Sequence, residues 1–202
     1  MKPILSKNRT YISSALLVVI LQVVFQGTTV AQITDYLKIP GPLQVDTTTF
    51  HLAWSLNPSP NYVKQEYLPE GQSLEKFHSM VTIDFVKGHY TAEEVMKTKI
   101  NELDALKKSN PIVNYKVYEK ENEFILDFLL SQNSPDGEKV IIIERNVYRY
   151  HTINTKGKEG LLAFCVTERA YEDSIVNFLE NLKANQRKLV NIVGTLKLPE
   201  PN

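Results

Sequence analysis

The stretch that most constrains this fold runs from residue 123 to residue 169, where apolar residues alternate as in three successive strands. The strands are predicted over 123–130, 139–151 and 160–168, and turn residues separate them at 134–137 and 154–160. A meander of this kind cannot bury its apolar face alone. We therefore expect the helical segments before and after it to cover it.

Two of these strands are apolar on both faces. In the first, Phe124, Leu126 and Phe128 point one way and Ile125 and Leu129 the other, and residues 140–143 show the same property. A strand of this type is usually covered from both sides. The sequence thus predicts an α+β fold, an antiparallel β-sheet of about six strands covered by helices on both faces, which is an αβα sandwich.

The rest of the chain supplies the remaining strands and the covering helices. Further strands are predicted over 50–56, 62–68 and 112–119, the first two as a hairpin. Helices are predicted from Ser73 to about Phe85, after a capping box at Thr91 to Glu94, and from about Tyr171 to Ala184. In the first of them the β-branched residues 81–83 could instead be irregular or extended, and residues 189–198 extend the last helix or pack as an arm. The domains are a leader over 1–31, an arm over 32–49 and a single α+β domain over 50–202.

The first residues read as an export signal. Lys2, Lys7 and Arg9 precede an apolar run over 12–25, and small residues end it at Ala31. The run is shorter than the roughly 18 residues of a spanning helix, so we expect cleavage near Ala31 and a periplasmic or extracellular protein. Retention of the leader as an anchor stays an alternative.

Charge and cysteine content exclude some classes of protein. The whole chain has 23 basic and 23 acidic residues, and loss of the three basic residues of the leader makes the remainder mildly acidic. This argues against a nucleic-acid partner, which requires a basic surface. Cys165, the only cysteine, lies in an apolar run and is predicted to be a buried small side chain, with a catalytic thiol or an intermolecular disulfide as alternatives.

Familiar catalytic motifs are absent from the sequence. It has no Gly-rich phosphate loop, no Gly-x-Ser-x-Gly and no His-Glu-x-x-His, so we predict no cofactor and no metal. A zinc site assembled from His78, Asp84 and His89 has no template spacing behind it.

The candidate binding residues lie at the outer end of the 139–151 strand. Arg145, Arg149 and His151 share one face and could meet Asp127 or Arg169 from neighbouring strands to receive an anionic ligand or partner. The alternative is that these charges only form structural ion pairs. On the other face lie Tyr148 and Tyr150, either as an aromatic binding platform or packed under a helix.

The order of elements between Phe50 and Leu189 resembles the PsbP-like αβα sandwich, which the extrinsic photosystem protein and a Ran-binding import factor share. Residues 66–77 also look like a segment of uncharacterised secreted bacterial domains. The resemblance implies an accessory or binding role for a protein partner or small ligand, without a family residue to assign.

Three functions are compatible with the sequence. The first is an exported, non-catalytic accessory or binding domain, the second a hydrolase with a His/carboxylate site, and the third a structural stabiliser of an envelope complex. A histidine, a carboxylate and a donor that converge within about 3 to 4 Å in one pocket would favour the hydrolase and contradict the non-catalytic domain.

Overall fold

The computed structural model describes residues 33–39, 41–121, 123–155 and 158–201. The predicted leader, residues 1–31, lies outside this range. Contacts group Gln32–Asn202 into one compact unit. Within the described part of the chain, no helix has both the length and the apolar character needed to cross a membrane.

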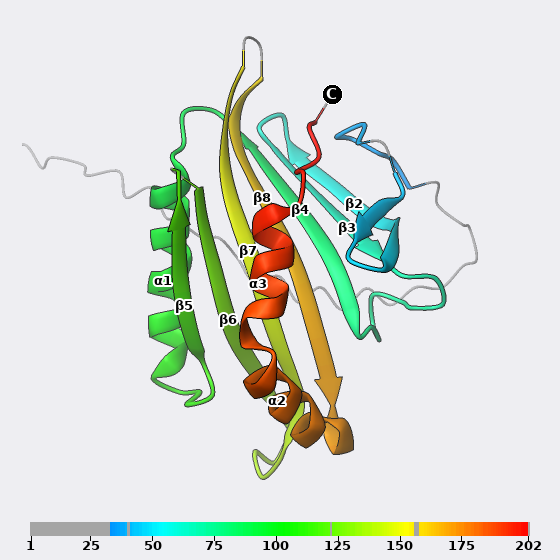
Figure 1. The fold of residues 1–202 in the computed structure, drawn as a ribbon, viewed down its shortest axis with the longest axis vertical. Coiled ribbons are helices and arrows are strands. Elements are labelled where there is room, and N and C mark those ends of the chain that lie inside the picture. Colours follow the sequence, from blue (N-terminus) through cyan, green and yellow to red (C-terminus); the bar gives the residue numbers. More distant parts are fainter. Residues whose placement is uncertain (1–32, 40, 122, 156–157, 202) are drawn as a thin grey trace, which may run out of the picture. The chain divides into compact units, whose positions relative to one another are not determined.

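In the described part of the chain, a single antiparallel sheet of eight strands forms most of the domain (Figure 1). The order across the sheet is β1-β2-β3-β4-β8-β7-β6-β5, so the last strand of the chain lies at its centre. The strands are β1 (Leu43–Val45), β2 (Thr48–Ser59), β3 (Tyr62–Leu68), β4 (Ser79–Lys87), β5 (Asn114–Lys120), β6 (Glu123–Asn133), β7 (Val140–Thr155) and β8 (Lys158–Tyr171).

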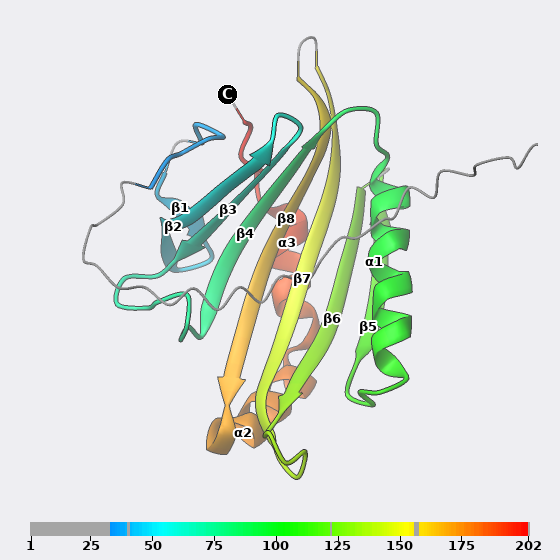
Figure 2. The ribbon, with the colours of Figure 1, turned by 180° about the vertical axis from the view of Figure 1, so that it is seen from behind.

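The helices lie on opposite faces of this sheet. α1 (Ala92–Lys107) lies on one face, while α2 (Ile175–Ala184) and α3 (Gln186–Thr195) lie on the other, as Figures 1 and 2 show. A short 3-10 turn, η1 (Glu172–Ser174), leads into α2. Each face therefore has its own apolar core, one beneath α1 around Met96, Leu103 and Phe128, and one beneath α3 around Val193 and Phe164.

The start of α1 confirms the predicted capping box. The Glu94 N–H donates to Thr91 Oγ1 over 3.2 Å, and the Glu94 carboxylate accepts from the Thr91 N–H over 3.1 Å. Two backbone donors that the first helical turn leaves without partners are satisfied in this way. Buried Met96 and Leu103 then face the sheet, which fixes α1 over β5, β6 and β7.

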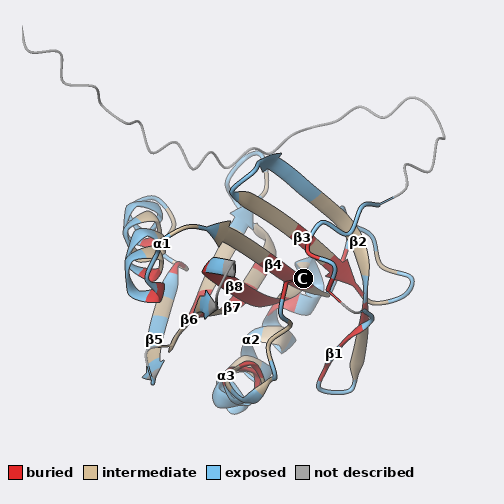
Figure 3. Ribbon diagram, turned by 90° about the horizontal axis from the view of Figure 1, so that it is seen from above, coloured by how far each residue is buried: buried red, intermediate tan, exposed pale blue. Residues whose placement is uncertain are grey.

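The predicted αβα sandwich of about six strands is wrong. Among the described residues, the sheet has eight strands and curls into a half-barrel with three short helices, and more residues lie in strands than in helices. In the view from above, the sheet bends from β5 round to β1 (Figure 3). The curl brings Leu43, Val45 and Phe50 into the same buried cluster as Val190 and Val193 of α3.

One of the two additional strands replaces a predicted helix. Residues 79–87 form β4, which pairs with β3 on one side and β8 on the other. Val81, Thr82 and Ile83 are almost completely buried there. β-Branched side chains lose rotamer freedom in a helix and pack well on a pleated surface. This preference explains why the segment forms a strand and not a helix.

The other additional strand lies in the predicted N-terminal arm. β1 pairs with the start of β2, and Leu37 and Ile39 before it are buried against the core. The Leu37 N–H donates to the side-chain oxygen of Gln65, itself completely buried, over 2.8 Å. The arm is thus part of the core on the α3 face.

Candidate functional site

The five predicted binding residues divide between the two faces of β7. Arg145, Arg149 and His151 lie on the α3 face, whereas Tyr148 and Tyr150 lie in or against the core beneath α1. The rings of the two tyrosines stack with centroids 5.8 Å apart. Tyr150 is only 2% exposed, and its hydroxyl has no hydrogen-bond partner among the described residues. The structure therefore brings Arg149 and His151 together in one cleft, whereas Arg145 lines another cavity and the two tyrosines lie on the opposite face of the sheet.

Arg145 is a buried ion-pair residue. Its guanidinium donates two parallel hydrogen bonds of 2.9 Å to Asp127 and one of 2.6 Å to the Gln186 carbonyl. The side chain is 3% exposed, and Glu168 lies 3.7 Å from its Nη1 atom. The two parallel N–H groups of the guanidinium match the two oxygens of the Asp127 carboxylate and neutralise its charge. Arg145 thereby fastens the first residue of α3 to the sheet.

Arg149 performs the same task at the other end of α3. It donates to Glu123 Oε2 over 2.9 and 2.6 Å, and its Nη1 donates to the carbonyls of Val193 and Leu196 over 3.0 and 2.8 Å. The last carbonyls of a helix have no partner within the helix and carry partial negative charge. The guanidinium satisfies two of them, so most of its hydrogen-bonding capacity is used inside the protein.

His151 completes a cluster around one carboxylate. Its Nδ1 atom lies 2.6 Å from Glu123 Oε1, while Glu123 Oε2 accepts from Arg149. The His151 side chain is 41% exposed. The contact with Glu123 orients the ring and leaves Nε2 as the nitrogen that can meet a ligand.

His151 and Arg149 line an open cleft of about 490 Å³ at the end of α3. This volume is in the range of small-molecule sites. Apolar side chains from β4, β7 and the segment after α3 form part of its walls: Phe85, Ile153, Leu196, Leu198, Pro199 and Pro201. Lys87, Lys197 and Glu200 also line it, and none of the three forms an ion pair with another described residue.

Several residues of the cleft were not predicted. Glu123 begins a strand in the sequence, but only the register of β6 against β7 places it beside Arg149 and His151. Leu196 and Leu198 follow α3 and reach the cleft because Arg149 fixes the end of that helix. The only hint of this wall in the sequence was the cluster of apolar residues over 189–198.

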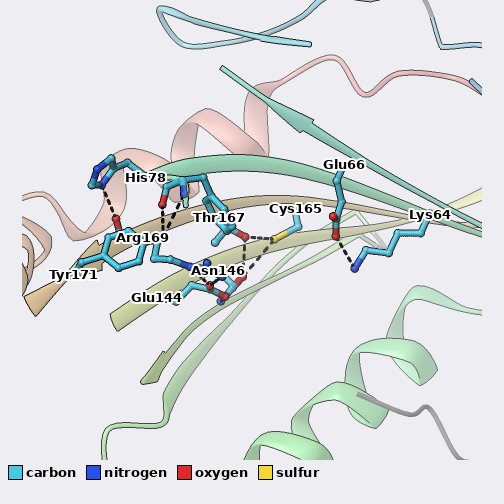
Figure 4. A network of polar contacts seen from close by, with 10 residues as sticks. Lys64, Glu66, His78, Glu144, Asn146, Cys165, Thr167, Arg169 and Tyr171 are labelled. Atoms are coloured by element: carbon cyan, nitrogen blue, oxygen red, sulfur yellow. Dashed lines mark hydrogen bonds and ion pairs between the residues drawn. The ribbon is translucent and has the colours of Figure 1, made fainter. Parts of the chain in front are cut away.

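Cys165 lies on the opposite face, in the polar network of Figure 4. It is 1% exposed, and its sulfur lies 3.6 Å from Thr167 Oγ1 and 3.9 Å from Asn146 Oδ1. Burial raises the pKa of the Cys165 thiol far above its usual value. A protonated, enclosed thiol is a poor nucleophile, and Cys165 has the packing role of a small buried side chain.

Metal-binding side chains do not converge in the described part of the chain. Within it, no three His, Cys, Asp or Glu side chains are placed to hold a metal ion. His89 contacts Glu159 at 3.5 Å, and Asp84 accepts a 2.6 Å hydrogen bond from the Tyr62 hydroxyl. These two side chains thus have protein partners.

A family model matches residues 37–198, most of the chain. The chain belongs to this uncharacterised protein family. The matched range contains Glu123, Arg149 and His151 and ends at Leu198, so most of the cleft lies within it. Neither the curated proteins nor the solved structures gave a match, and the PsbP-like resemblance therefore has no structural neighbour to support it.

Proposed function

We propose that the domain is an exported, non-catalytic binding protein whose cleft beside α3 takes a small organic acid. The observation that carries this proposal is the cleft of about 490 Å³ in which an oriented His151 faces apolar walls. Small-molecule sites combine apolar walls with a few placed polar groups in this way. Export rests on the leader and is tested by N-terminal sequencing of the protein recovered from its native compartment.

Charge selects an acid as the ligand. Glu123 is occupied by Arg149 and His151, which leaves Lys87, Lys197 and Glu200 as the charged groups of the cleft without an ion pair among described residues. Because Lys87 and Lys197 outnumber Glu200, the cleft favours a ligand with an anionic group. The apolar part of the ligand would lie against Phe85 and Leu198.

A titration followed by NMR tests the proposal with hexanoate as the probe and hexanol as its uncharged counterpart. We expect hexanoate to shift the amides of 149–154, 196–198 and 200. The Lys87→Ala/Lys197→Ala double variant should weaken binding by about tenfold, as expected when about 1.4 kcal/mol of electrostatic attraction is lost. Lys107→Ala/Lys108→Ala, exposed at the end of α1, is the matched control. Equal binding of hexanol and hexanoate would refute the acid selectivity.

A second candidate function is hydrolysis with His151 as general base. The 2.6 Å contact between His151 Nδ1 and Glu123 Oε1 supplies the histidine and the carboxylate of such a site, and Arg149, on the other carboxylate oxygen, is the donor beside them. Against it, Arg149 is engaged by Glu123 and helix carbonyls. Thr152 supplies the only side-chain hydroxyl among the described lining residues, so water would be the nucleophile.

The two functions are separated by an esterase assay with p-nitrophenyl acetate. The binding proposal expects no turnover above that of free imidazole at the same concentration. Turnover that His151→Gln abolishes, while hexanoate binding persists, would establish the hydrolase in its place.

A further inference from the structure

A second cavity, of about 620 Å³, lies near the N-terminal end of α3. The turn between β1 and β2, the ends of β4 and β8, and helices α2 and α3 all contribute to its lining. Its apolar lining includes Phe50, Val166 and Leu189, which belong to the main core cluster. The cavity is therefore built on the buried core of the α3 face.

Glu168 is the acidic group of this cavity that lacks close partners. Its side chain is 41% exposed, and its carboxylate lies 3.7 Å from Nη1 of Arg145, beyond hydrogen-bonding distance. The carboxylate accepts no side-chain hydrogen bond within the described ranges. Arg145 is meanwhile bound through its Nε and Nη2 atoms to Asp127.

The charges around Arg145 do not balance. Two carboxylates, Asp127 and Glu168, face one buried guanidinium. Burial raises the pKa of Glu168 and the charge of Asp127 adds to this, while Arg145 and Lys188 oppose it. Lys188 also lies 3.5 Å from Asp46, so its charge is shared between two acids. A partly buried excess negative charge is stabilised by a cation.

We propose that this cavity binds an organic cation, an ammonium group on an apolar body, with the ammonium at Glu168. Asn177 and Asn181 of α2 line the same cavity, and their amide oxygens can accept from the ammonium hydrogens. For Asn181 Oδ1 this bond comes in addition to the one it accepts from Asn185 Nδ2 over 2.9 Å. The apolar body lies against Phe50 and Leu189. This site differs from the cleft of the proposed function in position and in the sign of the charge it selects.

The test is an NMR titration of the whole domain with hexylammonium, with hexanol as the uncharged counterpart. We expect hexylammonium to shift amides of 166–170 and 177–181, and hexanol to bind at least tenfold more weakly. The Lys87→Ala/Lys197→Ala variant of the other cleft should bind hexylammonium as the unchanged protein does. Hexanoate binding in that cleft and hexylammonium binding in this cavity can therefore succeed or fail independently of each other.

Two variants at the site decide the role of Glu168. Glu168→Gln should weaken hexylammonium binding at least tenfold, whereas Glu180→Gln, on an exposed position of α2 outside the cavity, should leave it unchanged. Asn177→Asp places a second carboxylate at the cavity and should strengthen binding severalfold, without disturbing the buried Arg145. Unchanged affinity in both Glu168→Gln and Asn177→Asp, or equal binding of hexanol, would overturn the proposal.

Discussion

At the scale of single residues, we expect the buried Arg145 to contribute more to stability than any exposed charge. Arg145→Ala leaves Asp127, 8% exposed, as an uncompensated buried carboxylate. Breaking a buried pair in this way costs about 3–5 kcal/mol of unfolding free energy. Urea denaturation measures the loss.

A matched arginine provides the control for this prediction. Arg187 lies on α3 and is exposed, and we find no ion pair to it from the described residues. Arg187→Ala should change stability by no more than about 0.5 kcal/mol. If Arg145→Ala costs less than about 1 kcal/mol, the buried pair with Asp127 does not hold the sheet and α3 together.

The candidate site was predictable only in part at this scale. The period of a strand placed Arg145, Arg149 and His151 on one face, and Asp127 was among their expected neighbours. Glu123, which joins Arg149 to His151, depends on the register between β6 and β7, and a slip of one residue would move it to the other face. Sequence spacing within one strand contains no such information.

At the scale of elements, α3 depends on the two arginines that bind its ends. Arg149→Lys keeps the charge but loses the planar fork that reaches Glu123, Val193 and Leu196. We expect a loss of about 1–3 kcal/mol, since hydrogen bonds to charged groups are broken. Hydrogen exchange should become faster at amides 193–196, and Arg187→Lys should leave it unchanged. Equal protection in both variants would contradict the role of Arg149.

The central pair β4–β8 contains a position that only glycine can occupy without displacement. A Cβ atom on Gly160 would lie 2.5 Å from the Val86 carbonyl oxygen and 2.9 Å from the ring of Phe85. Gly160→Ala must therefore move backbone or the Phe85 ring and should cost about 1–3 kcal/mol. The cleft is also expected to change, because Phe85 lines it.

Gly41→Ala is the control for this prediction, because a Cβ atom there meets nothing within 4 Å. Thermal unfolding of the two variants gives the comparison. A melting temperature for Gly160→Ala within the error of that for Gly41→Ala would show that the two strands adjust freely.

At the scale of the whole molecule, the sequence indicated the meander and its helices but not the curl of the sheet. The strands β3, β5, β6, β7 and β8 have clear alternation, and the capping box at Thr91 marked α1. β4 was missed because its apolar residues also fit a helical stripe, and pairing with β3 and β8 decides between the two. Strand number and curl follow from such long-range pairing, and from β1 closing over the core.

The ionisation of the buried tyrosines measures how well the cores of the fold exclude solvent. Burial raises the pKa of Tyr67 to about 12, and it also raises the pKa of Tyr62, Tyr148 and Tyr150 well above the usual value of a phenol. The native state thus keeps these phenol protons, whereas the unfolded chain releases them near pH 10. Stability must fall as pH rises above about 10, since the native state then binds more protons than the unfolded state.

Tyrosinate absorbance followed beside circular dichroism tests this coupling between ionisation and unfolding. We expect Tyr62, Tyr67, Tyr148 and Tyr150 to ionise only together with the loss of the β-sheet signal. Tyr150→Phe removes one late-ionising group and a buried hydroxyl that has no partner among the described residues, so it should preserve or raise stability by about 1 kcal/mol. Ionisation of all tyrosines near pH 10 with an unchanged sheet signal would mean that the two faces of the sheet admit solvent, and that neither the core beneath α1 nor that beneath α3 is closed.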